Sequence, residues 1–259
     1  MNWFQALVLG VIQGLTEFLP VSSSGHLEIA KSLLGVDPDT SFYFTVAVHG
    51  ATVLSTIFVF WKEIMNLITG SLKFKMNEET SYVLKIILSM IPVGIVGVLL
   101  KEPIKHLFNG NLVFIGLMLL VTSAVLALAH FIKKGDRPIG YKDAFIIGIS
   151  QAIAVIPGIS RSASTISTGL IIGNRKEEIA RFSFLMVLIP VLGENLLEII
   201  SGDVTMNSAG FGSVIIGFLA AFVSGYFACR WMISLVKRSK LIWFSIYCAV
   251  MGLLSIFVI

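Results

Sequence analysis

Six stretches of this 259-residue sequence are long and apolar enough to form helices that cross a lipid bilayer. Each approaches the ~20 residues that a helix needs to span the hydrocarbon layer. A segment in lipid must be helical, because the bilayer offers its backbone groups no hydrogen-bond partner. Charged residues make up only 13% of the chain, well below the ~25% typical of a soluble domain. The predicted spans are 42–61, 83–100, 112–132, 182–200, 213–235 and 241–259.

Two further apolar stretches, 3–34 and 144–173, are interrupted near their middle by proline, glycine and a run of hydroxyl residues. Proline removes a backbone donor and disfavours helix at the residue before it. Each stretch is therefore predicted to form a helix, a break and a second helix. This pattern is typical of a re-entrant hairpin, which enters the membrane and returns to the side it came from.

The distribution of lysine and arginine predicts the orientation. Connections 62–85, 133–142, 175–181 and 230–240 hold four, four, three and four of these residues, 15 of the 19 in the chain. By the positive-inside rule these connections lie in the cytoplasm. The opposite connections hold only Lys31, Lys101 and Lys105, and both termini are then predicted to lie outside. The basic pI of about 9.1 therefore reports membrane topology and not nucleic-acid binding.

The two halves of the sequence carry matching short motifs. Gly10-x-x-Gln13 matches Gly148-x-x-Gln151 at an offset of 138, and each match is followed by a proline and a hydroxyl run. Phe-x-Phe recurs at 42 and at 182. Each half contains one hairpin and three spans, and an odd number of spans turns the second half upside down. Inverted repeats with broken helices place the functional site near the midplane, at the interface of the halves.

The predicted fold is thus an all-α polytopic membrane protein, with six transmembrane helices and two re-entrant hairpins in an inverted-topology repeat. No polar linker divides the chain, so residues 1–259 are expected to form a single membrane domain. The first repeat covers 1–132, and the second covers 144–259.

The first break places an acid, a run of serines and a histidine close together. Gln13 and Glu17 are four residues apart and share a helix face just before the break. An acid at this depth costs roughly 2.5–3.5 kcal/mol and should face a partner or a wet cavity. The serines can cap the second half-helix, whose free N–H groups form an anion site. The candidate residues here are Gln13, Glu17, Ser22, Ser23, Ser24, Gly25 and His26.

The second break adds a fixed positive charge. The planar guanidinium of Arg161 suits two phosphate oxygens at once, and the hydroxyls beside it can cap a second helix N-terminus. The candidates are Ser160, Arg161, Ser162 and Thr165. The two hairpins together supply charge neutralisation, a nucleophile and a proton carrier, which phosphoryl transfer from a diphosphate requires.

Each polar group also has a structural explanation. Buried serines in membrane helices commonly bond a backbone carbonyl, and Arg161 paired with Glu17 would lock the hairpins together. His49, inside a predicted span, is expected to pack in the core. The concentration of polar groups at two matching breaks favours a functional site.

At these breaks the sequence resembles the undecaprenyl-diphosphatase family, also called the bacitracin-resistance proteins. QGLTEFLPVSSSGH at 13–26 is similar to the first motif of the family and PGISRSAST at 157–165 to the second. The resemblance covers essentially the whole chain. It implies an enzyme of the bacterial inner membrane with a site open to the outer face. The reaction implied is hydrolysis of undecaprenyl diphosphate to undecaprenyl phosphate and phosphate, which recycles the lipid carrier for cell-wall synthesis.

The resemblance also implies roles for single residues. Glu17 corresponds to the essential acid, Ser23 to the proposed nucleophile, His26 to the proposed proton carrier and Arg161 to the phosphate-binding arginine. A divalent cation, Mg²⁺ or Ca²⁺, is implied as well, with Glu17 as its candidate ligand. Gln13 stands where many relatives have glutamate, so this helix offers a single carboxylate, and the cation is expected to arrive with the diphosphate.

Two questions stay open at this level. The first is the nucleophile, since either Ser23 attacks the phosphorus or His26 activates a water. The second is the function itself, since a flippase or transporter of prenyl phosphates would use the same midplane site. A serine three residues from a histidine favours the enzyme, because carriage alone does not require it. Spans rich in glycine and serine fit a homodimer, and they fit internal packing equally.

Overall fold

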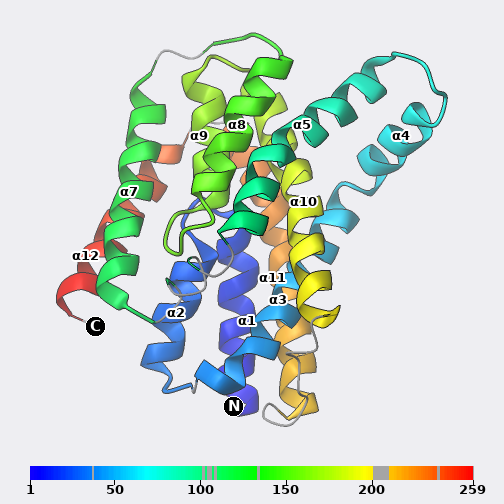
Figure 1. Ribbon diagram of the computed structural model, residues 1–259. Helices are drawn as coiled ribbons and strands as arrows, with labels where there is room; N and C mark the ends of the chain where they lie inside the picture. The colour runs from blue at the N-terminus through cyan, green and yellow to red at the C-terminus, as the bar shows by residue number, and fades with distance from the viewer. Residues whose placement is uncertain are drawn as a thin grey trace.

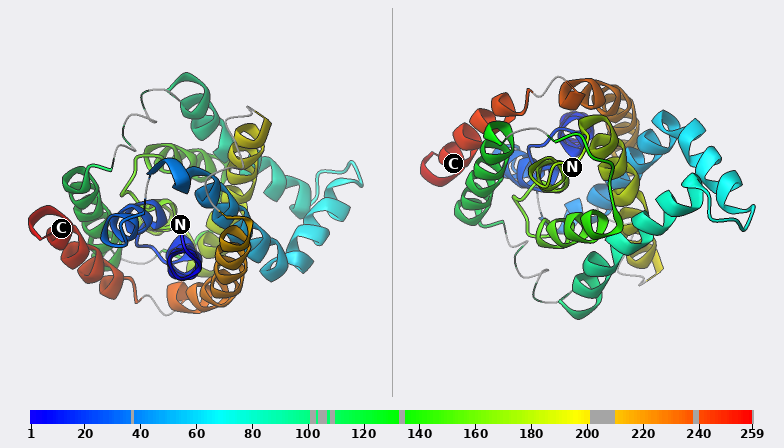
Figure 2. Two further views of the ribbon diagram at one scale, coloured as in Figure 1. Left: turned by 90° about the horizontal axis from the view of Figure 1, so that it is seen from below. Right: turned by 90° about the horizontal axis from the view of Figure 1, so that it is seen from above.

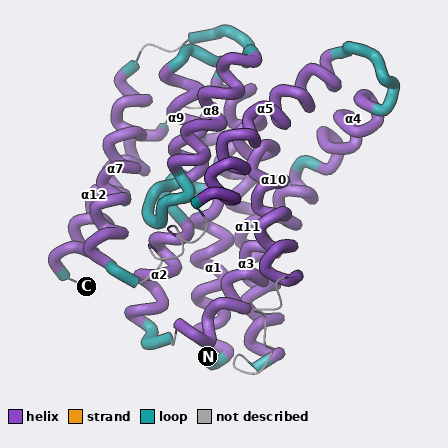
Figure 3. Tube along the Cα trace, viewed as in Figure 1, coloured by secondary structure: helices purple, strands orange, loops and turns teal. Residues whose placement is uncertain are grey.

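The chain folds into a bundle of helices around two breaks that lie inside the bundle (Figures 1 and 3). The computed structural model describes residues 1–36, 38–100, 103, 107, 110–132, 135–200, 210–237 and 240–258. The described part contains eleven helices and no strand. They are α1 (Trp3–Phe18), α2 (Ser23–Leu33), α3 (Pro38–Val59), α4 (Trp61–Ser71), α5 (Glu78–Leu99), α7 (Leu112–Phe131), α8 (Tyr141–Ile153), α9 (Arg161–Ile171), α10 (Lys176–Ile200), α11 (Phe211–Lys237) and α12 (Leu241–Phe257).

Several of these helices are suited to a bilayer. In the described residues, α5, α7 and the Phe211–Val236 part of α11 are long and apolar enough to cross one. The bent pair α3–α4 makes a fourth if it counts as one span, and α12 is apolar but shorter. Large apolar side chains lie exposed along these helices, which is stable only in lipid. The chain is therefore a polytopic membrane protein. Lys101 and Lys105, used above for the charge distribution, lie outside the described residues.

The predicted span 42–61 corresponds to α3, which ends at Val59, two residues before the predicted end. The chain then turns by 74° into α4, a helix that the sequence did not predict. Phe60 stands at the bend and is buried in the main core cluster. The predicted connection 62–85 therefore contains an additional helix, α4, before α5 begins.

Each half of the chain packs a broken helix pair against a helix of the other half. α1 packs along α11, and α8 packs along α5. Both contacts are close at a glycine: a Cβ on Gly10 would lie 2.3 Å from the carbonyl oxygen of Gly217, and one on Gly148 would lie 2.3 Å from that of Ser89. A separate pair, α7 and α12, is joined by reciprocal bonds between Ser123 and Ser245. Figure 2 shows these helices surrounding α2 and α9.

Candidate active site

The first break lies between α1 and α2 and ends in a strained serine. Ser22 has a φ of +72°, a conformation that non-glycine residues adopt at a cost of ~1–3 kcal/mol. Its hydroxyl caps α2 by accepting the backbone N–H of Gly25 at 3.3 Å. The Ser22 side chain therefore caps the N-terminus of α2 in the middle of the bundle, where the free N–H groups of the helix can face an anion.

The second break lies between α8 and α9 and is held by a residue of α7. Gly158 has a φ of +91°, and a Cβ there would lie 2.8 Å from the carbonyl oxygen of Ile115. Thr122 donates its hydroxyl to the carbonyl of Gly158 at 3.1 Å and accepts the N–H of Ser160, also at 3.1 Å. The Ser160 hydroxyl caps α9 by accepting the N–H of Ala163 at 3.2 Å. Sequence reasoning missed Thr122, because one threonine in a span carries no signal.

The two breaks contact each other directly. Ser162 donates its hydroxyl to the carbonyl oxygen of Leu19 at 3.2 Å, and the N–H of Gly158 points to the hydroxyl of Ser24 at 3.5 Å. A Cβ on Gly25 would lie 3.4 Å from the Cα of Gly158, so the backbones approach closely at this point. The prediction that these distant segments meet is confirmed.

Glu17 is the centre of the cluster that results. Its Oε1 accepts from the guanidinium of Arg161 at 2.7 Å, and its Oε2 accepts from the hydroxyl of Ser23 at 2.5 Å. Gln13 donates to the same Oε2 at 2.9 Å, as expected for residues one turn apart. Only 10% of the Glu17 side chain is exposed, so this carboxylate is desolvated and fully engaged by donors. The structure thus brings Gln13, Glu17, Ser23 and Arg161 together.

His49 joins this cluster from α3. Its Nε2 lies 3.8 Å from Oε2 of Glu17, and its Nδ1 faces the carbonyl oxygen of Thr45 at 3.0 Å. With 20% of its side chain exposed, His49 borders the site instead of packing in the core as expected. Its position in an apolar span gave no hint of this neighbour.

His26 points to a different partner. Its Nδ1 lies 2.8 Å from the carbonyl oxygen of Ser22, and its Nε2 lies 2.8 Å from the hydroxyl of Tyr247 on α12. The two rings also stack, with centroids 5.4 Å apart and planes 11° from parallel. The carbonyl requires a proton on Nδ1, so in the neutral ring Nε2 accepts from Tyr247. No bond joins His26 to Glu17 in the described residues, and sequence reasoning missed Tyr247.

The remaining candidates serve the local backbone. Thr165 bonds the carbonyl oxygen of Arg161 at 2.9 Å and makes a short contact with the hydroxyl of Ser183 on α10. Ser160 and Ser162 are 3.2 Å apart, and Ser22 and Ser24 are 3.3 Å apart, each pair joined by hydroxyl oxygens. These residues shape the two helix starts around the ion pair.

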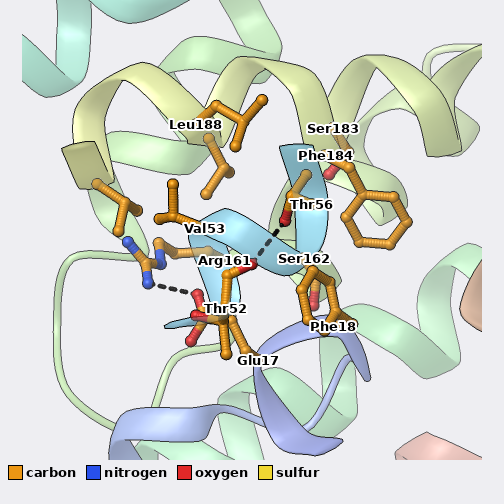
Figure 4. Close-up of a pocket in the computed structure, with 12 residues that line it drawn as sticks. Glu17, Phe18, Thr52, Val53, Thr56, Arg161, Ser162, Ser183, Phe184 and Leu188 are labelled. Atoms are coloured by element: carbon orange, nitrogen blue, oxygen red, sulfur yellow. Dashed lines mark hydrogen bonds and ion pairs between the residues drawn. The ribbon is translucent and has the colours of Figure 1, made fainter. Parts of the chain in front are cut away.

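A cavity of about 30 Å³ lies against the ion pair on the side of α3 and α10 (Figure 4). This volume admits water. Glu17 and Arg161, in contact at 2.7 Å, form part of its wall. Its lining is formed by Glu17, Phe18, Thr52, Val53, Thr56, Arg161, Ser162, Ser183, Phe184, Val187, Leu188 and Val191.

The site offers few ligands for a metal ion. Among the described residues, no three histidine, cysteine, aspartate or glutamate side chains gather in a way that would hold one. Glu17 is the one carboxylate of the cluster described above, and the buried Oε1 of Gln13 has no hydrogen-bond partner. A carboxylate and an amide oxygen fit a Mg²⁺ or Ca²⁺ ion that takes its other ligands from phosphate and water.

The fold and the site together define a polytopic membrane protein in which a buried cluster of Gln13, Glu17, Ser23 and Arg161 lies where two broken helix pairs meet. Residues 6–254 match the family model described as "Bacitracin resistance protein BacA", and the chain belongs to this family.

Curated relatives match along the whole chain. It is 52% identical over 260 residues to a protein of Parabacteroides distasonis and 54% identical over 258 residues to one of Christiangramia forsetii. A protein of Methanosphaera stadtmanae is 37% identical over 274 residues. In all three comparisons 99% of this chain and 98% of the relative are covered. Each of these relatives is named undecaprenyl-diphosphatase.

Proposed function

We propose that this chain is a membrane phosphatase that hydrolyses undecaprenyl diphosphate to undecaprenyl phosphate and inorganic phosphate. Full-length identity to proteins named for this activity supports the proposal. The observation that carries it is the contact of Glu17 with both Arg161 and Ser23, at 2.7 and 2.5 Å. A proton acceptor, a hydroxyl and a guanidinium in one desolvated cluster are what transfer of a phosphoryl group needs.

Charge neutralisation falls to Arg161 and the two helix starts. The diphosphate replaces Glu17 as the partner of the guanidinium, and the free N–H groups at the starts of α2 and α9 face its oxygens. Because Glu17 occupies the guanidinium at 2.7 Å, binding in this way requires Arg161 and Glu17 to part. Once separated from Arg161, the Glu17 carboxylate is free to act as a proton acceptor.

Glu17 is placed to accept the proton of Ser23. In the covalent route the Ser23 oxygen attacks the terminal phosphorus, its proton passes to Glu17, and the bond from phosphorus to the bridging oxygen breaks. Undecaprenyl phosphate leaves, and water then attacks the phosphoserine to release phosphate and restore the hydroxyl. The 2.5 Å contact with Ser23 favours this route, since His26 contacts Ser22 and Tyr247 instead.

His26 lies one turn along α2 from Ser23, and we assign it the second proton transfer, to the leaving oxygen or from the attacking water. Tyr247 acts on it as a positioning residue. The stacked phenol holds the ring in place, its hydroxyl bonds Nε2, and the carbonyl of Ser22 keeps the proton on Nδ1. When Nε2 takes up a proton, Tyr247 can turn its hydroxyl to accept instead.

A divalent cation is part of the proposal. Glu17 and the unpartnered amide oxygen of Gln13 would hold it together with the substrate. When bound, the ion would neutralise charge on the diphosphate. Arg161 remains the fixed cation of the site in either case.

For the membrane arrangement we propose six spans, with α1–α2 and α8–α9 as re-entrant pairs in an inverted repeat. The equivalent glycines Gly10 and Gly148 support it, because each admits a helix of the other half at the same distance. We further propose the bacterial inner membrane, a site open to the outer face, and both termini outside. Labelling of cysteines introduced at the two ends of the bundle in intact cells tests this orientation. A homodimer stays a prediction.

The test of the activity is phosphate release from undecaprenyl diphosphate by the purified chain in detergent, where no movement between leaflets can be scored. A phospho-enzyme trapped in wild type and lost in Ser23→Ala selects the covalent route over direct attack by water. The comparisons give the flippase alternative no support. Lipid movement between leaflets without phosphate release would nevertheless favour the flippase over the phosphatase.

A further inference from the structure

α4 and the turn that follows it form an arm that projects sideways from the bundle; "the arm" here means residues 61–77. Figures 1 and 2 show it standing apart from the other helices, in contact with α5. The arm is firmly built: the side chain of Asn77 donates to the carbonyl oxygen of Gly70 at 3.0 Å and caps α5 by accepting the N–H of Thr80 at 2.8 Å. A Cβ on Gly70 would lie 2.6 Å from the side chain of Glu79, so the two helices are in close contact.

One face of α4 is an apolar stripe with no partner in the described residues. Trp61, Met65, Ile68 and Leu72 recur at spacings of four, three and four, which places them in one row along the helix. Their exposed fractions are 56, 37, 48 and 63%. The inner face is different, since Ile64 and Leu67 pack against the main core cluster.

The turn after the stripe alternates apolar and cationic residues, from Leu72 through Lys73, Phe74 and Lys75 to Met76. All five side chains are exposed, Phe74 at 91% and Met76 at 76%. Phe74 also has a positive φ of 49°, a strained conformation for an aromatic residue. The turn therefore presents an exposed aromatic ring between two exposed lysines.

The acidic residues of the region are mostly used within the protein. Glu63 lies 3.3 Å from Arg181, and the side chain of Glu79 lies against Gly70. Glu78 is exposed, but it stands in the first turn of α5, where a carboxylate favours the helix start. The exposed surface of the arm therefore presents Lys62, Lys73 and Lys75 beside the apolar stripe.

The bend sets how the arm meets a bilayer. α3 has 22 residues and a length of ~33 Å, so it crosses the hydrocarbon layer by itself. α4 then departs at 74°, close to the membrane plane, on the side where the positive-inside rule puts the cytoplasm. A helix lying in this plane, apolar on one face and lysine-rich beside it, is the form that interfacial helices take.

We propose that the arm lies in the cytoplasmic membrane interface and binds the headgroups of anionic phospholipids. Trp61, Met65, Ile68 and Leu72 enter the boundary of the acyl chains, while Lys73 and Lys75 flank Phe74 and contact the phosphates. The negative surface potential of this leaflet attracts lysines next to the membrane. A second protein copy could contact the same apolar stripe, but the acid of the arm, Glu63, is paired with Arg181. Contact between two arms would therefore leave Lys73 and Lys75 without an acidic partner.

A fluorescent label at position 74 reports the docked state. The native cysteines, Cys229 and Cys248, have 0% exposure, so Phe74→Cys can be labelled selectively with an environment-sensitive dye. The full chain is placed in nanodiscs of phosphatidylcholine alone or with phosphatidylglycerol, and the dye is quenched with acrylamide, a neutral probe that surface charge does not repel. Two lysines near an anionic surface favour docking by roughly 30-fold. We expect acrylamide quenching to fall by about threefold or more when phosphatidylglycerol is present.

Two double variants are compared. The arm variant carries Lys73→Gln and Lys75→Gln, and the control variant carries Lys142→Gln and Lys240→Gln, which lie on the same predicted cytoplasmic side but outside the arm. The arm variant should lose the response to phosphatidylglycerol, and the control variant should keep it. Equal quenching in both lipids, or a response that survives the arm variant, overturns the proposal. The proposal is also overturned if, in detergent, the dye becomes less accessible to acrylamide as the protein concentration rises, because a second copy would then cover the stripe. Phosphate release by each variant verifies that it is folded.

Discussion

Replacing Glu17 with glutamine tests the centre of the proposed site with almost no change in shape. The substitution removes the negative charge that holds Arg161 at 2.7 Å and the acceptor that receives the Ser23 proton at 2.5 Å. The amide keeps one oxygen, so the loss is chemical and not a loss of packing. Catalysis and substrate binding should respond in opposite directions.

Catalysis should fall because a positioned proton acceptor contributes about 10²–10⁴-fold to rate. We therefore expect kcat to drop by about 10³-fold. With Mg²⁺ at saturating concentration, so that a weaker cation site does not limit binding, KM should not rise, since in the wild type the diphosphate must first separate Arg161 from Glu17. In the variant the guanidinium is free, so KM should stay constant or fall. Replacing Arg161 itself with glutamine should instead raise KM as well as lower kcat.

Stability needs a separate control. Breaking a buried pair costs ~3–5 kcal/mol when a charge is left alone, but the Arg161 side chain is 23% exposed, which lowers the expected cost to about 1–3 kcal/mol. Asp143→Asn is the matched control, because Asp143 is buried and pairs with Arg137 at 2.8 Å at the far end of α8. It should lower the Tm comparably while leaving kcat intact.

The assay is phosphate release in detergent across a range of undecaprenyl diphosphate concentrations, with thermal unfolding of each variant measured alongside. A Glu17→Gln enzyme with kcat within fivefold of wild type would refute the assignment of Glu17 as proton acceptor. A rise in KM with unchanged kcat would show that the carboxylate serves binding, against the view that it competes for Arg161.

Three further predictions follow from single contacts. Tyr247→Phe keeps the stack on His26 but removes the 2.8 Å hydrogen bond, so we expect kcat to fall about tenfold and the pH profile of kcat to shift. Tyr247→Leu removes the stack as well and should lower kcat further. An unchanged pH profile in the phenylalanine variant would argue against a positioning role for Tyr247. Gly148→Val places a Cβ 2.3 Å from the Ser89 carbonyl oxygen and should lower the free energy of unfolding by about 2–3 kcal/mol. In the control Gly94→Ala, the Cβ meets nothing within 4 Å, so the stability should not change. Equal Tm values for the two variants would contradict the close packing of α8 on α5. Chelation of divalent cations should abolish phosphate release, and Gln13→Leu should raise the Mg²⁺ concentration needed to restore it; full activity in chelator would remove the cation from the proposal.

The sequence allowed the contact between the two breaks to be predicted because charges in a bilayer need partners. Glu17 and Arg161 are 144 positions apart, yet each is costly in lipid, and the pairing that was the structural explanation of Arg161 is present at 2.7 Å. The serine caps were equally predictable, since a helix that starts inside the bundle must satisfy its first N–H groups locally. Both inferences depend on polar groups that would otherwise lack a partner in the bilayer, and not on the detailed packing of the bundle.

The partners of the two histidines could not be predicted in this way. His26 was expected to share a cavity with Glu17, but its partner is Tyr247, 221 positions away on a helix whose sequence reads as an ordinary span. His49 was expected in the core and lies 3.8 Å from Glu17. A neutral imidazole costs little to place near either neighbour, so the choice depends on rotation of α2 and α3 by a fraction of a turn. Hydrophobic periodicity does not resolve such a rotation.

The bond between Arg161 and Glu17 therefore has two consequences that oppose each other. It joins the two halves of the chain at their centre, and it occupies the groups that the substrate must engage. A stronger pair would stabilise the fold and weaken diphosphate binding by the same free energy, because the ligand has to break it first. The contacts that join the breaks elsewhere, from Ser162 to Leu19 and from Gly158 to Ser24, carry no charge that the substrate needs. They allow the ion pair to open while the two breaks stay together, so the site can widen without separating the halves.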